Sequence, residues 1–361
     1  MIGHGEQLPE SSTTRFCYVV LCHRDAAQVL GLVRRIRELS ATATVLVRHD
    51  RGPGFLDEPA VTAAGGLLLP DPYPVRWGGW SMVQASLRAF AHARAVLDPD
   101  WLVLISGQDW PATDLASWET EVAGSGADAV VSGAPVDLTF SPGGPLSRIT
   151  EADLMRARWT HRWTPLPRVR ALDRVPARLR RGLNAAFVAT VMWHQRPVML
   201  RALPRGLGWL VGVRRGGTGL PEQWQIVKGE QWLAVSRRAM DGVRATVRAD
   251  PGIVAFFATT HIPDESFLQT LLHNDPGLSV RPGPVSFHRF AGPAASPDAL
   301  THVDVPAALA SGAPFARKID VDVDATVAGL LDAAVDATLT VPPPLGRGPG
   351  PAGARRGAAG E

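Results

Sequence analysis

The chain has 361 residues, of which 45% are hydrophobic, and a net charge of +3 at neutral pH. A chain of this length can bury roughly 70–75% of its unfolded surface, so it needs no disulfide or structural metal to fold. No stretch approaches the roughly 18 uninterrupted apolar residues of a transmembrane helix, and the first fifteen residues lack the apolar core of a signal peptide. From these features we expect neither a membrane-spanning nor a secreted chain, but a cytoplasmic protein.

The first regular elements follow a polar arm at residues 1–14. Residues 16–22 are a continuous apolar run, which is typical of a strand buried on both faces. Apolar residues at helical spacing predict a helix from about Asp25, and residues 44–47 predict a second buried strand. This strand–helix–strand order predicts a parallel, doubly wound sheet with helices on both faces, and therefore an α/β fold.

Both cysteines of the chain fall in the first predicted strand. Cys17 and Cys22 are five positions apart, so they point to opposite faces and cannot form a local disulfide. They indicate buried thiols in a reducing compartment, which agrees with the expected cytoplasmic location.

A glycine turn and two further strands come next. Residues 75–79 form the turn, and Ser81 is a good N-cap for a helix that runs to about Leu97. Residues 101–105 predict a third buried strand, and residues 129–132 predict another short one.

Polar residues and the glycine turn occupy the ends of these strands. Asp50 follows the second strand, the Trp77–Gly79 turn precedes a helix, and residues 106–109 (Ser-Gly-Gln-Asp) follow the third strand. Ligands of open parallel sheets bind at the carboxyl ends of the strands. The sequence therefore predicts a nucleotide-shaped site at this edge, without the signature of a phosphate-binding loop.

Residues 141–220 are irregular and strongly basic, and we expect a helical insert beside the sheet. Fifteen arginines and three acids lie between Arg148 and Arg215, so this segment carries a charge of +12 and the rest of the chain −9. The excess indicates an acidic partner, such as a phosphorylated or carboxylated substrate or a lipid headgroup surface. The alternative is that the arginines only coat the surface of the insert and reflect a coding bias rather than a partner. Nucleic acid is not expected, since the segment has no zinc-finger or aromatic RNA-binding signature.

Regular patterns return after the insert. A strand-like run starts near Val227 and is followed by a helix through Met240, and a second helix is predicted at 264–273. Late strands are expected around Val280 and at 285–287. The pattern ends with a helix over 322–339, and the Pro-, Gly- and Arg-rich residues 341–361 should be disordered. We thus expect a single domain over residues 15–340.

A carboxylate and a cation pair in the last third of the chain suit one class of chemistry. Asp264 and Glu265 stand at the start of a helical pattern, and Arg317 and Lys318 are adjacent. Two cations can hold a diphosphate leaving group while a carboxylate removes the proton from an attacking hydroxyl. The alternative is structural: a surface Arg-Lys pair, and acids that complement a helix dipole.

Five short motifs follow one another in a characteristic order. They are Trp77-Gly78-Gly79-x-Ser81, Ser106-Gly107-x-Asp109-x-Pro111, Lys228-Gly229-x-Gln231-Trp232, Pro263-Asp264-Glu265-Ser266-Phe267 and Phe315-Ala316-Arg317-Lys318. Over about residues 16–320 the chain resembles the core-2/I-branching β-1,6-N-acetylglucosaminyltransferase family, which also includes the peptide O-xylosyltransferases. It is similar to bacterial, cytosolic members, because it has neither the membrane anchor nor the disulfides of eukaryotic relatives.

This resemblance implies a GT-A-like, Rossmann-like fold and an inverting transfer of a sugar, N-acetylglucosamine above all, from a UDP-sugar to a hydroxyl, giving a β-linkage. It implies a site that works without a metal or other cofactor. The general base falls on Glu265, with Asp264 as its rival and acceptor-side neighbour, and the diphosphate-binding pair falls on Arg317 and Lys318. The remaining donor contacts fall on Asp50, Trp77, Gly78, Ser106, Asp109 and Gln231. Trp232 is expected on the acceptor side, where it can stack on a sugar, although it and Trp77 suit a core equally well.

Some residues depart from the family pattern. Xylosyltransferases have an acid where this chain has Gln231, which weakens the case for UDP-xylose. An arginine that many animal branching enzymes carry upstream of the diphosphate lysine has no counterpart here. The run Asp320-x-Asp322-x-Asp324 starts a helix, so we interpret it as capping rather than as the metal-binding motif of other GT-A enzymes.

Two alternatives stay open. The same fold can use another donor, such as UDP-xylose, UDP-glucose or a pathway-specific nucleotide sugar. A non-catalytic relative that binds sugar or nucleotide is the second, although the presence of Glu265 together with the cation pair speaks against it. The acceptor is a hydroxyl-bearing molecule, for which the basic insert favours an acidic or lipid-linked compound or a natural product.

Overall fold

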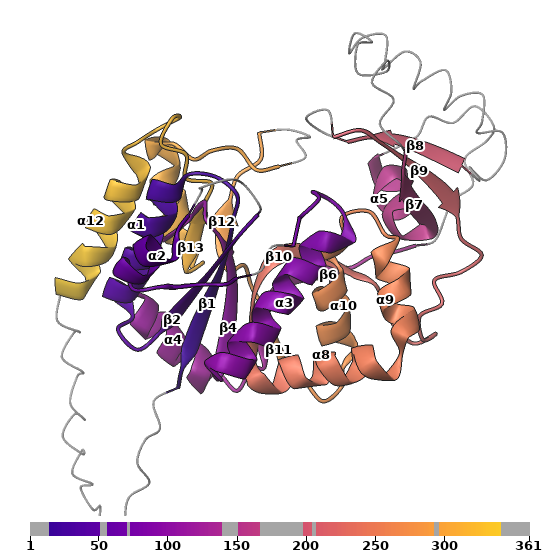
Figure 1. The fold of residues 1–361 in the computed structure, drawn as a ribbon, viewed down its shortest axis with the longest axis horizontal. Coiled ribbons are helices and arrows are strands. Elements are labelled where there is room, and N and C mark those ends of the chain that lie inside the picture. Colours follow the sequence, from indigo (N-terminus) through magenta and orange to yellow (C-terminus); the bar gives the residue numbers. More distant parts are fainter. Residues whose placement is uncertain are drawn as a thin grey trace, which may run out of the picture.

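The computed structural model describes residues 14–50, 56–70, 73–138, 151–166, 198–203, 207–291 and 296–340. The disordered tail predicted at 341–361 and nearly all of the polar arm lie outside these residues, as does part of the basic insert. Most of the described chain folds around one seven-stranded sheet with the strand order β11-β6-β10-β4-β1-β2-β3 (Figure 1).

The strands of the main sheet are mostly parallel. Their bounds are β1 (Phe16–Cys22), β2 (Thr44–His49), β3 (Leu67–Leu68), β4 (Trp101–Ser106), β6 (Ala129–Pro135), β10 (Val227–Ser236) and β11 (Val280–Pro282). β1 pairs with β2 and β4 in parallel, and β11 pairs with β6 in the same way. β10 is antiparallel to both β4 and β6. The predicted α/β class with a mostly parallel sheet is confirmed.

The antiparallel direction of β10 has a simple cause. Val227 at its start lies opposite Pro135 at the end of β6. The whole insert is therefore a long connection between two antiparallel neighbours, which needs no crossover. It leaves and re-enters the sheet at the carboxyl end of β6, the edge where ligands of such sheets bind.

Helices cover both faces of the sheet, as predicted. One face carries α1 (Ala26–Leu39) and α4 (Leu115–Gly124), and the other carries α3 (Trp80–Val96), α8 (Arg237–Ala249) and α10 (Phe267–Asn274) (Figure 1). The C-terminal α12 (Val327–Thr340) joins the first face, where Arg35 of α1 pairs with Asp332 at 2.8 Å and with Asp336 at 2.6 Å. Shorter helices are α2 (Glu58–Ala63), α9 (Pro251–Ala258), η3 (His302–Asp304) and α11 (Val305–Ala310).

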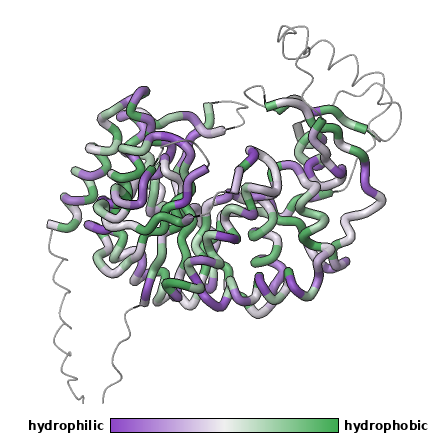
Figure 2. The backbone as a smooth tube through the Cα atoms, in the orientation of Figure 1, coloured by the Kyte–Doolittle hydropathy of each residue, from purple (hydrophilic) through white to green (hydrophobic). Residues whose placement is uncertain are grey.

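The core forms where the apolar strands meet these helices. Every residue of β4 is buried, and β1 is buried except at Leu21. The hydrophobic stretches of the tube therefore concentrate in the strands, between the helical layers (Figure 2). Cys17 and Cys22 are free thiols inside this core, as predicted. None of the helices in the described ranges is long and apolar enough to cross a membrane.

A small second sheet joins distant parts of the chain. It consists of β12 (Ser286–His288), β13 (Phe315–Arg317) and β5 (Asp109–Pro111), in that order. β13 runs antiparallel to β5, with Arg317 opposite Asp109. This pairing brings two of the motifs together that are about 200 residues apart in sequence.

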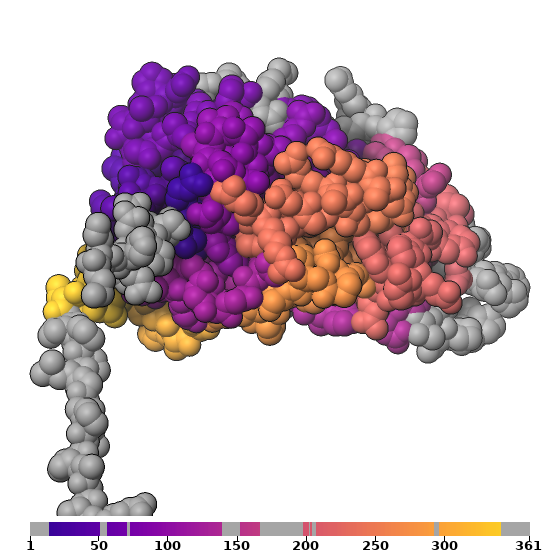
Figure 3. All heavy atoms as spheres, turned by 90° about the horizontal axis from the view of Figure 1, so that it is seen from below, coloured from indigo at the N-terminus to yellow at the C-terminus, as the bar shows by residue number. Residues whose placement is uncertain are grey.

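The described part of the basic insert is not the helical unit that the sequence predicts. After α5 (Glu151–Thr160) it contains an antiparallel sheet of β7 (His161–Pro165), β9 (Trp209–Arg214) and β8 (Val198–Ala202). Alternating apolar residues in these strands pack as a small separate core with Ala157, Trp163, Met199, Leu203 and Leu210. The strand period of two was missed among the many arginines. β8 and β9 lie toward one end of the described part of the chain (Figure 3).

Three predicted helix starts differ in detail. α3 is capped by Gly79, and Ser81 lies inside the helix, where its Oγ accepts a hydrogen bond from the Arg76 backbone N–H at 2.7 Å. Residues 263–265 form a separate 3₁₀ turn, η2, before α10. α12 begins at Val327, because the carboxylates of Asp320 and Asp324 accept backbone N–H bonds in the preceding turn.

Candidate functional site

Glu265, the predicted base, lies at the end of the η2 turn and reaches solvent. Its side chain is 32% exposed, and Oε2 accepts a hydrogen bond from Arg158 Nη2 at 2.8 Å. Lys228 Nζ lies 3.8 Å from the same oxygen. Both contacts use Oε2, so Oε1 has no hydrogen-bond partner among the described residues and can accept a proton.

The turn that carries Glu265 is held by an arginine of the insert. Arg158, in α5, is 4% exposed and donates from Nε to the carbonyl of His261 and from Nη2 to that of Ile262, both at 3.2 Å. Ile262 has φ of 53°, an unusual conformation for a β-branched residue, and its N–H donates to the Gly78 carbonyl at 2.9 Å. Trp159 Nε1 donates to Ser266 Oγ at 3.0 Å. The insert and the Gly78 turn thus fix the position of the predicted base.

Asp264, the rival carboxylate, points into the interior. It lines a small internal cavity together with Gln231 and Phe267, and its Oδ1 has no hydrogen-bond partner among the described residues. Burial, and secondly the charge of Glu265, raise the pKa of Asp264 to about 7. A buried, partly protonated carboxyl is less suited to receive a proton from a bound acceptor than the partly exposed Glu265 is.

This buried carboxyl predicts a pH-dependent stability. The pKa of Asp264 is about 7 in the folded chain against 3.8 ordinarily, so the folded state binds more protons between these values and stability falls as the pH rises through them. The loss is at most roughly 4 kcal/mol. Urea unfolding at pH 4.5 and 7 should show a smaller decline for Asp264→Asn than for the wild type. Equal declines would show that Asp264 is already ionised when folded.

Arg317, predicted to hold the diphosphate, sits above Trp232. Its guanidinium carbon lies 4.3 Å from the ring centroid, and its side chain is 11% exposed. Nη2 donates to Ser106 Oγ at 3.4 Å, and Nε lies 3.8 Å from Asp109 Oδ1. Burial lowers the pKa of Arg317, and the charges of Asp109 and Glu230 oppose this shift. The structure therefore places Trp232 with the predicted donor group.

Asp109 holds this cluster together through hydrogen bonds. It is fully buried, and its Oδ2 accepts hydrogen bonds from the backbone N–H and the Oγ of Ser106 at 2.7 and 2.5 Å. Its Oδ1 accepts another from Ser286 Oγ. Both oxygens of Asp109 are thus engaged with Ser106, Ser286 and Arg317, and its predicted contact with a donor stays a prediction.

Glu230 is a member of the cluster that the sequence analysis missed. Its carboxylate lies 3.5 Å from His288 Nδ1, and burial raises its pKa while His288, Arg317 and Lys228 act in the opposite direction. Glu230 interacts electrostatically with Arg317, and Trp232 stacks on the guanidinium group of Arg317. The pairing of β10 with β6 shifts register between Gly229 and Leu233, so the alternation of a regular strand is broken here and could not have grouped these two residues. Gln231 faces the other way, toward Asp264.

The neighbouring Gly229 is required by close packing. A Cβ there would lie 1.8 Å from the Ser132 carbonyl oxygen, so only glycine lets β10 pass β6 at this point.

Lys318 and Arg317 contact different residues. Its Nζ donates to Ser296 Oγ, and its carbonyl accepts from the Leu300 N–H at 2.8 Å. Residues 292–295, which precede Ser296, lie outside the described part of the chain. The two members of the predicted diphosphate pair therefore reach different partners, and their joint role stays a prediction.

The remaining predicted donor residues lie at the edges of this region. Asp50 follows β2, and its Oδ1 accepts from Arg48 Nη1 at 3.0 Å. Trp77 packs against the small core of the insert, with its ring edge-on to His261 at 6.3 Å between centroids. Gly78 is buried against the Glu265 turn through the Ile262 bond. Their roles toward a donor stay predictions.

Charged side chains link the two ends of the candidate site. Arg158 and Lys228 contact Glu265, and Glu230 interacts electrostatically with Lys228 and Arg317, so that charges of alternating sign follow one another. The exposed fraction of the side chains falls from 37% at Lys228 to 11% at Arg317. This arrangement offers a carboxylate near solvent at one end and a buried, pre-oriented cation at the other.

Comparisons with solved structures give only distant likenesses. A cytidylyltransferase from Leptospira borgpetersenii serovar Hardjo-bovis has a TM-score of 0.24 and 10% identity, over 33% of this chain and 54% of that one. HddC from Yersinia pseudotuberculosis has the same TM-score and identity, over 35% and 60%. The chain therefore spans little more than half the length of either. A putative glucose-1-phosphate thymidylyltransferase from Bacillus anthracis, solved with sucrose, reaches 0.32 at 11% identity, over 82% and 94%.

The match to a protein family is more informative. No curated protein matches the chain. The family model described as Core-2/I-Branching enzyme matches residues 59–128, a segment that holds the Trp77–Gly79 turn, β4, and the Ser106 and Asp109 anchor of Arg317. The resemblance is thus confirmed for this segment, which holds two of the five motifs: over residues 59–128 the chain is similar to the core-2/I-branching enzymes.

Proposed function

We propose that this chain is an inverting glycosyltransferase that moves a sugar, N-acetylglucosamine first among the candidates, from a UDP-sugar to an acceptor hydroxyl and forms a β-linkage. The family match supports a sugar donor and an acceptor. The observation that carries the proposal is the state of Glu265. Its Oε2 is fixed by Arg158 and its other oxygen is left for a proton, on a side chain that is one third exposed.

In this proposal Glu265 is the general base. An inverting displacement needs one base within hydrogen-bond reach of the attacking hydroxyl, on the side opposite the leaving group. The proton moves from the hydroxyl to Glu265, the acceptor oxygen bonds to the anomeric carbon, and the bond from that carbon to the UDP oxygen breaks. A rigidly held carboxylate suits this step, because a base that is misplaced by 1 Å loses much of its effect.

We assign the leaving diphosphate to the cationic end of the site. Arg317 can fork onto two phosphate oxygens, and Lys318 can add a point charge. Arg317 is already stacked on Trp232 and oriented by Asp109, so little ordering is needed when UDP binds. These cations can compensate the charge that develops on the leaving oxygen, and we therefore propose that the reaction needs no metal.

Glutamine at position 231 favours no particular donor in this structure, because it faces the interior next to Asp264. UDP-xylose, UDP-glucose and pathway-specific nucleotide sugars are the alternatives to UDP-N-acetylglucosamine. A relative that binds donor without turnover is the remaining alternative.

A panel of UDP-sugars tests the proposal. One UDP-sugar should raise the melting temperature of the protein more than sugars without UDP do. UDP should be released from that donor when an acceptor is supplied. EDTA should change neither result. Donor-dependent stabilisation that disappears on chelation would refute metal independence, and stabilisation without any UDP release would favour the non-catalytic alternative.

A further inference from the structure

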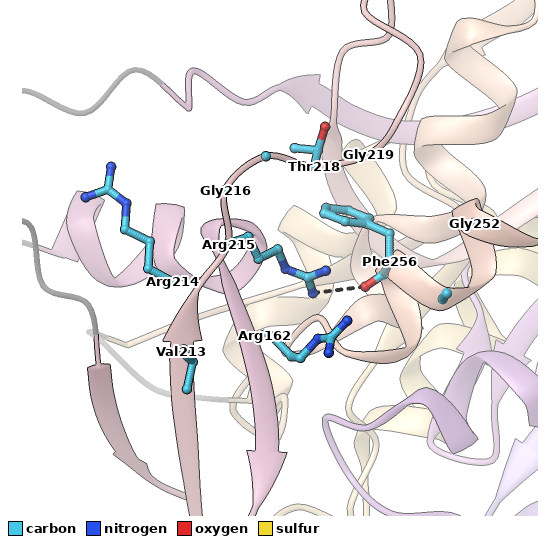
Figure 4. A pocket seen from close by; sticks show the side chains of 11 residues that line it. Arg162, Val213, Arg214, Arg215, Gly216, Thr218, Gly219, Gly252 and Phe256 are labelled. Atoms are coloured by element: carbon cyan, nitrogen blue, oxygen red, sulfur yellow. Dashed lines mark hydrogen bonds between the residues drawn. The ribbon is translucent and has the colours of Figure 1, made fainter.

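A cavity of about 500 Å³ lies on the insert, apart from all predicted donor residues. Arg162 of β7, Arg214 and Arg215 at the end of β9, the glycine-rich residues 216–219 and Phe256 of α9 line it. Arg162 and Arg215 point toward Phe256, whereas Arg214 points away (Figure 4). Two guanidinium groups therefore face this space from neighbouring strands.

Arg215 is held rigidly at the cavity wall. Its Nη2 donates to the Phe256 carbonyl at 3.0 Å and to Thr259 Oγ1 at 2.7 Å. The guanidinium carbon lies 4.5 Å from the centroid of the Phe256 ring. Its Nε has no hydrogen-bond partner among the described residues. The position of this charge is thus set before any ligand arrives.

Two of the positive charges at the cavity lack a counter-ion in the described part of the chain, because no carboxylate there pairs with Arg162 or Arg215. Burial, and then the charge of Arg162, lower the pKa of Arg215 to about 10, so the two cations destabilise each other. An anion between them would remove this repulsion and would accept charge-assisted hydrogen bonds.

The glycines of the loop point to a ligand as well. A Cβ at Gly216 or Gly217 would meet nothing within 4 Å, and neither residue has a positive φ. Neither packing nor backbone conformation within the described chain therefore requires glycine there. Glycine does permit a ligand to approach the backbone N–H groups closely, as in other anion-binding loops.

The cavity and the proposed base are built on the same two segments. Arg162 follows Arg158, which holds Glu265, by four residues. On the other segment, Phe256 and Thr259 precede Glu265, and the Thr259 carbonyl accepts from the Trp163 N–H at 2.8 Å. A molecule anchored at the cavity would thus be held by the same rigid unit that positions the base.

We propose that this cavity binds the anionic group, a carboxylate or a phosphate, of the acceptor molecule. The identification of the ligand as the acceptor rests on the proposed transferase function. The binding of an anion to the cavity does not depend on that function. The ligand is then an acidic sugar or a phosphorylated compound with a free hydroxyl, held by Arg162, Arg215 and the backbone of the loop.

Direct binding tests the cavity without any turnover. Glucuronate and glucose 6-phosphate, with glucose as the neutral probe, are titrated calorimetrically into the wild type, Arg162→Gln and Arg244→Gln. Arg244 is an exposed residue of α8, so its variant removes the same charge elsewhere. We expect saturable binding of the acidic probes only, weakened at least tenfold by Arg162→Gln and unchanged by Arg244→Gln. Equal binding of glucose, or no effect of Arg162→Gln, would overturn the proposal.

Transfer assays then identify the source of the anion. With matched acidic and neutral glycosides as acceptors, Arg162→Gln should raise KM about tenfold for the acidic one only and leave kcat unchanged. If acidic probes bind but KM does not respond, the cavity takes a free ion and the acceptor assignment is wrong. If the wild type releases no UDP from any donor, the proposed function fails, while the titration still decides whether the cavity binds an anion.

Discussion

Glu265→Gln is expected to lower kcat by about 10²–10⁴-fold and to leave the affinity for UDP nearly unchanged. A glutamine keeps the size and one acceptor oxygen but cannot take the proton of the attacking hydroxyl, and general bases contribute an effect of this size. The substitution also breaks the ion pair with Arg158, so the free energy of unfolding has to be compared. Single-turnover transfer and UDP titration measure the two quantities separately.

The matched control is Glu222→Gln. Glu222 is exposed and has no ion pair among the described residues, so its variant removes the same charge from the surface. It should retain wild-type kcat. A Glu265→Gln variant that stays folded and loses less than about tenfold in kcat would exclude Glu265 as the base. Asp264→Asn, already needed for the stability measurement, would then show whether the buried carboxyl takes that role.

The main sheet could be predicted because its signal is local. β1 and β4 are continuous apolar runs rich in β-branched residues, the pattern of strands that are buried on both faces. The antiparallel direction of β10 could not be predicted, since it depends on where the insert re-enters the sheet rather than on β10 itself. α9 is a short apolar stretch, and such runs do not distinguish a helix from a strand by periodicity.

Among the residues of the site, too, those with a local sequence signal could be predicted and those defined by tertiary contacts could not. Glu265 and Arg317 could be proposed because motifs carry them, and the structure gives both a defined electrostatic setting. Arg158 is one of fifteen arginines in the insert, and nothing in its neighbourhood distinguishes it. Its importance arises only when α5 packs on the Glu265 turn, 107 residues away in sequence. Contacts of this kind are tertiary and leave no mark on a single sequence.

Arg158 also explains how the insert affects the predicted chemistry. A buried arginine that holds a carboxylate and two carbonyls cannot be removed without leaving those groups unsatisfied. The insert therefore helps to fix the proposed base, and the acceptor site that we propose on the insert is connected to Glu265 through the same residues. This connection gives a physical reason for acceptor recognition and proton removal to share one unit.

Arg317→Lys is expected to weaken UDP binding by about 10–100-fold with only a small change in stability. Lysine keeps a cation beside Asp109 and Glu230, so the buried acids remain compensated. It loses the planar fork that can bind two phosphate oxygens, and a hydrogen bond between charged groups is worth about 1.5–3 kcal/mol. Stacking on Trp232 weakens as well, because an ammonium group lacks the flat guanidinium face.

Titration of UDP, at two salt concentrations, measures this effect. The matched control is Arg281→Lys, since Arg281 is a partly exposed residue that pairs with Glu121 at 2.6 Å and should leave UDP affinity unchanged. The loss in Arg317→Lys should persist at high salt, because a buried cation is screened much less than a surface charge. If the folded variant binds UDP as tightly as the wild type, Arg317 only stabilises the strand pairing of β13, and the diphosphate must be held elsewhere, with Lys228 the next cation to test.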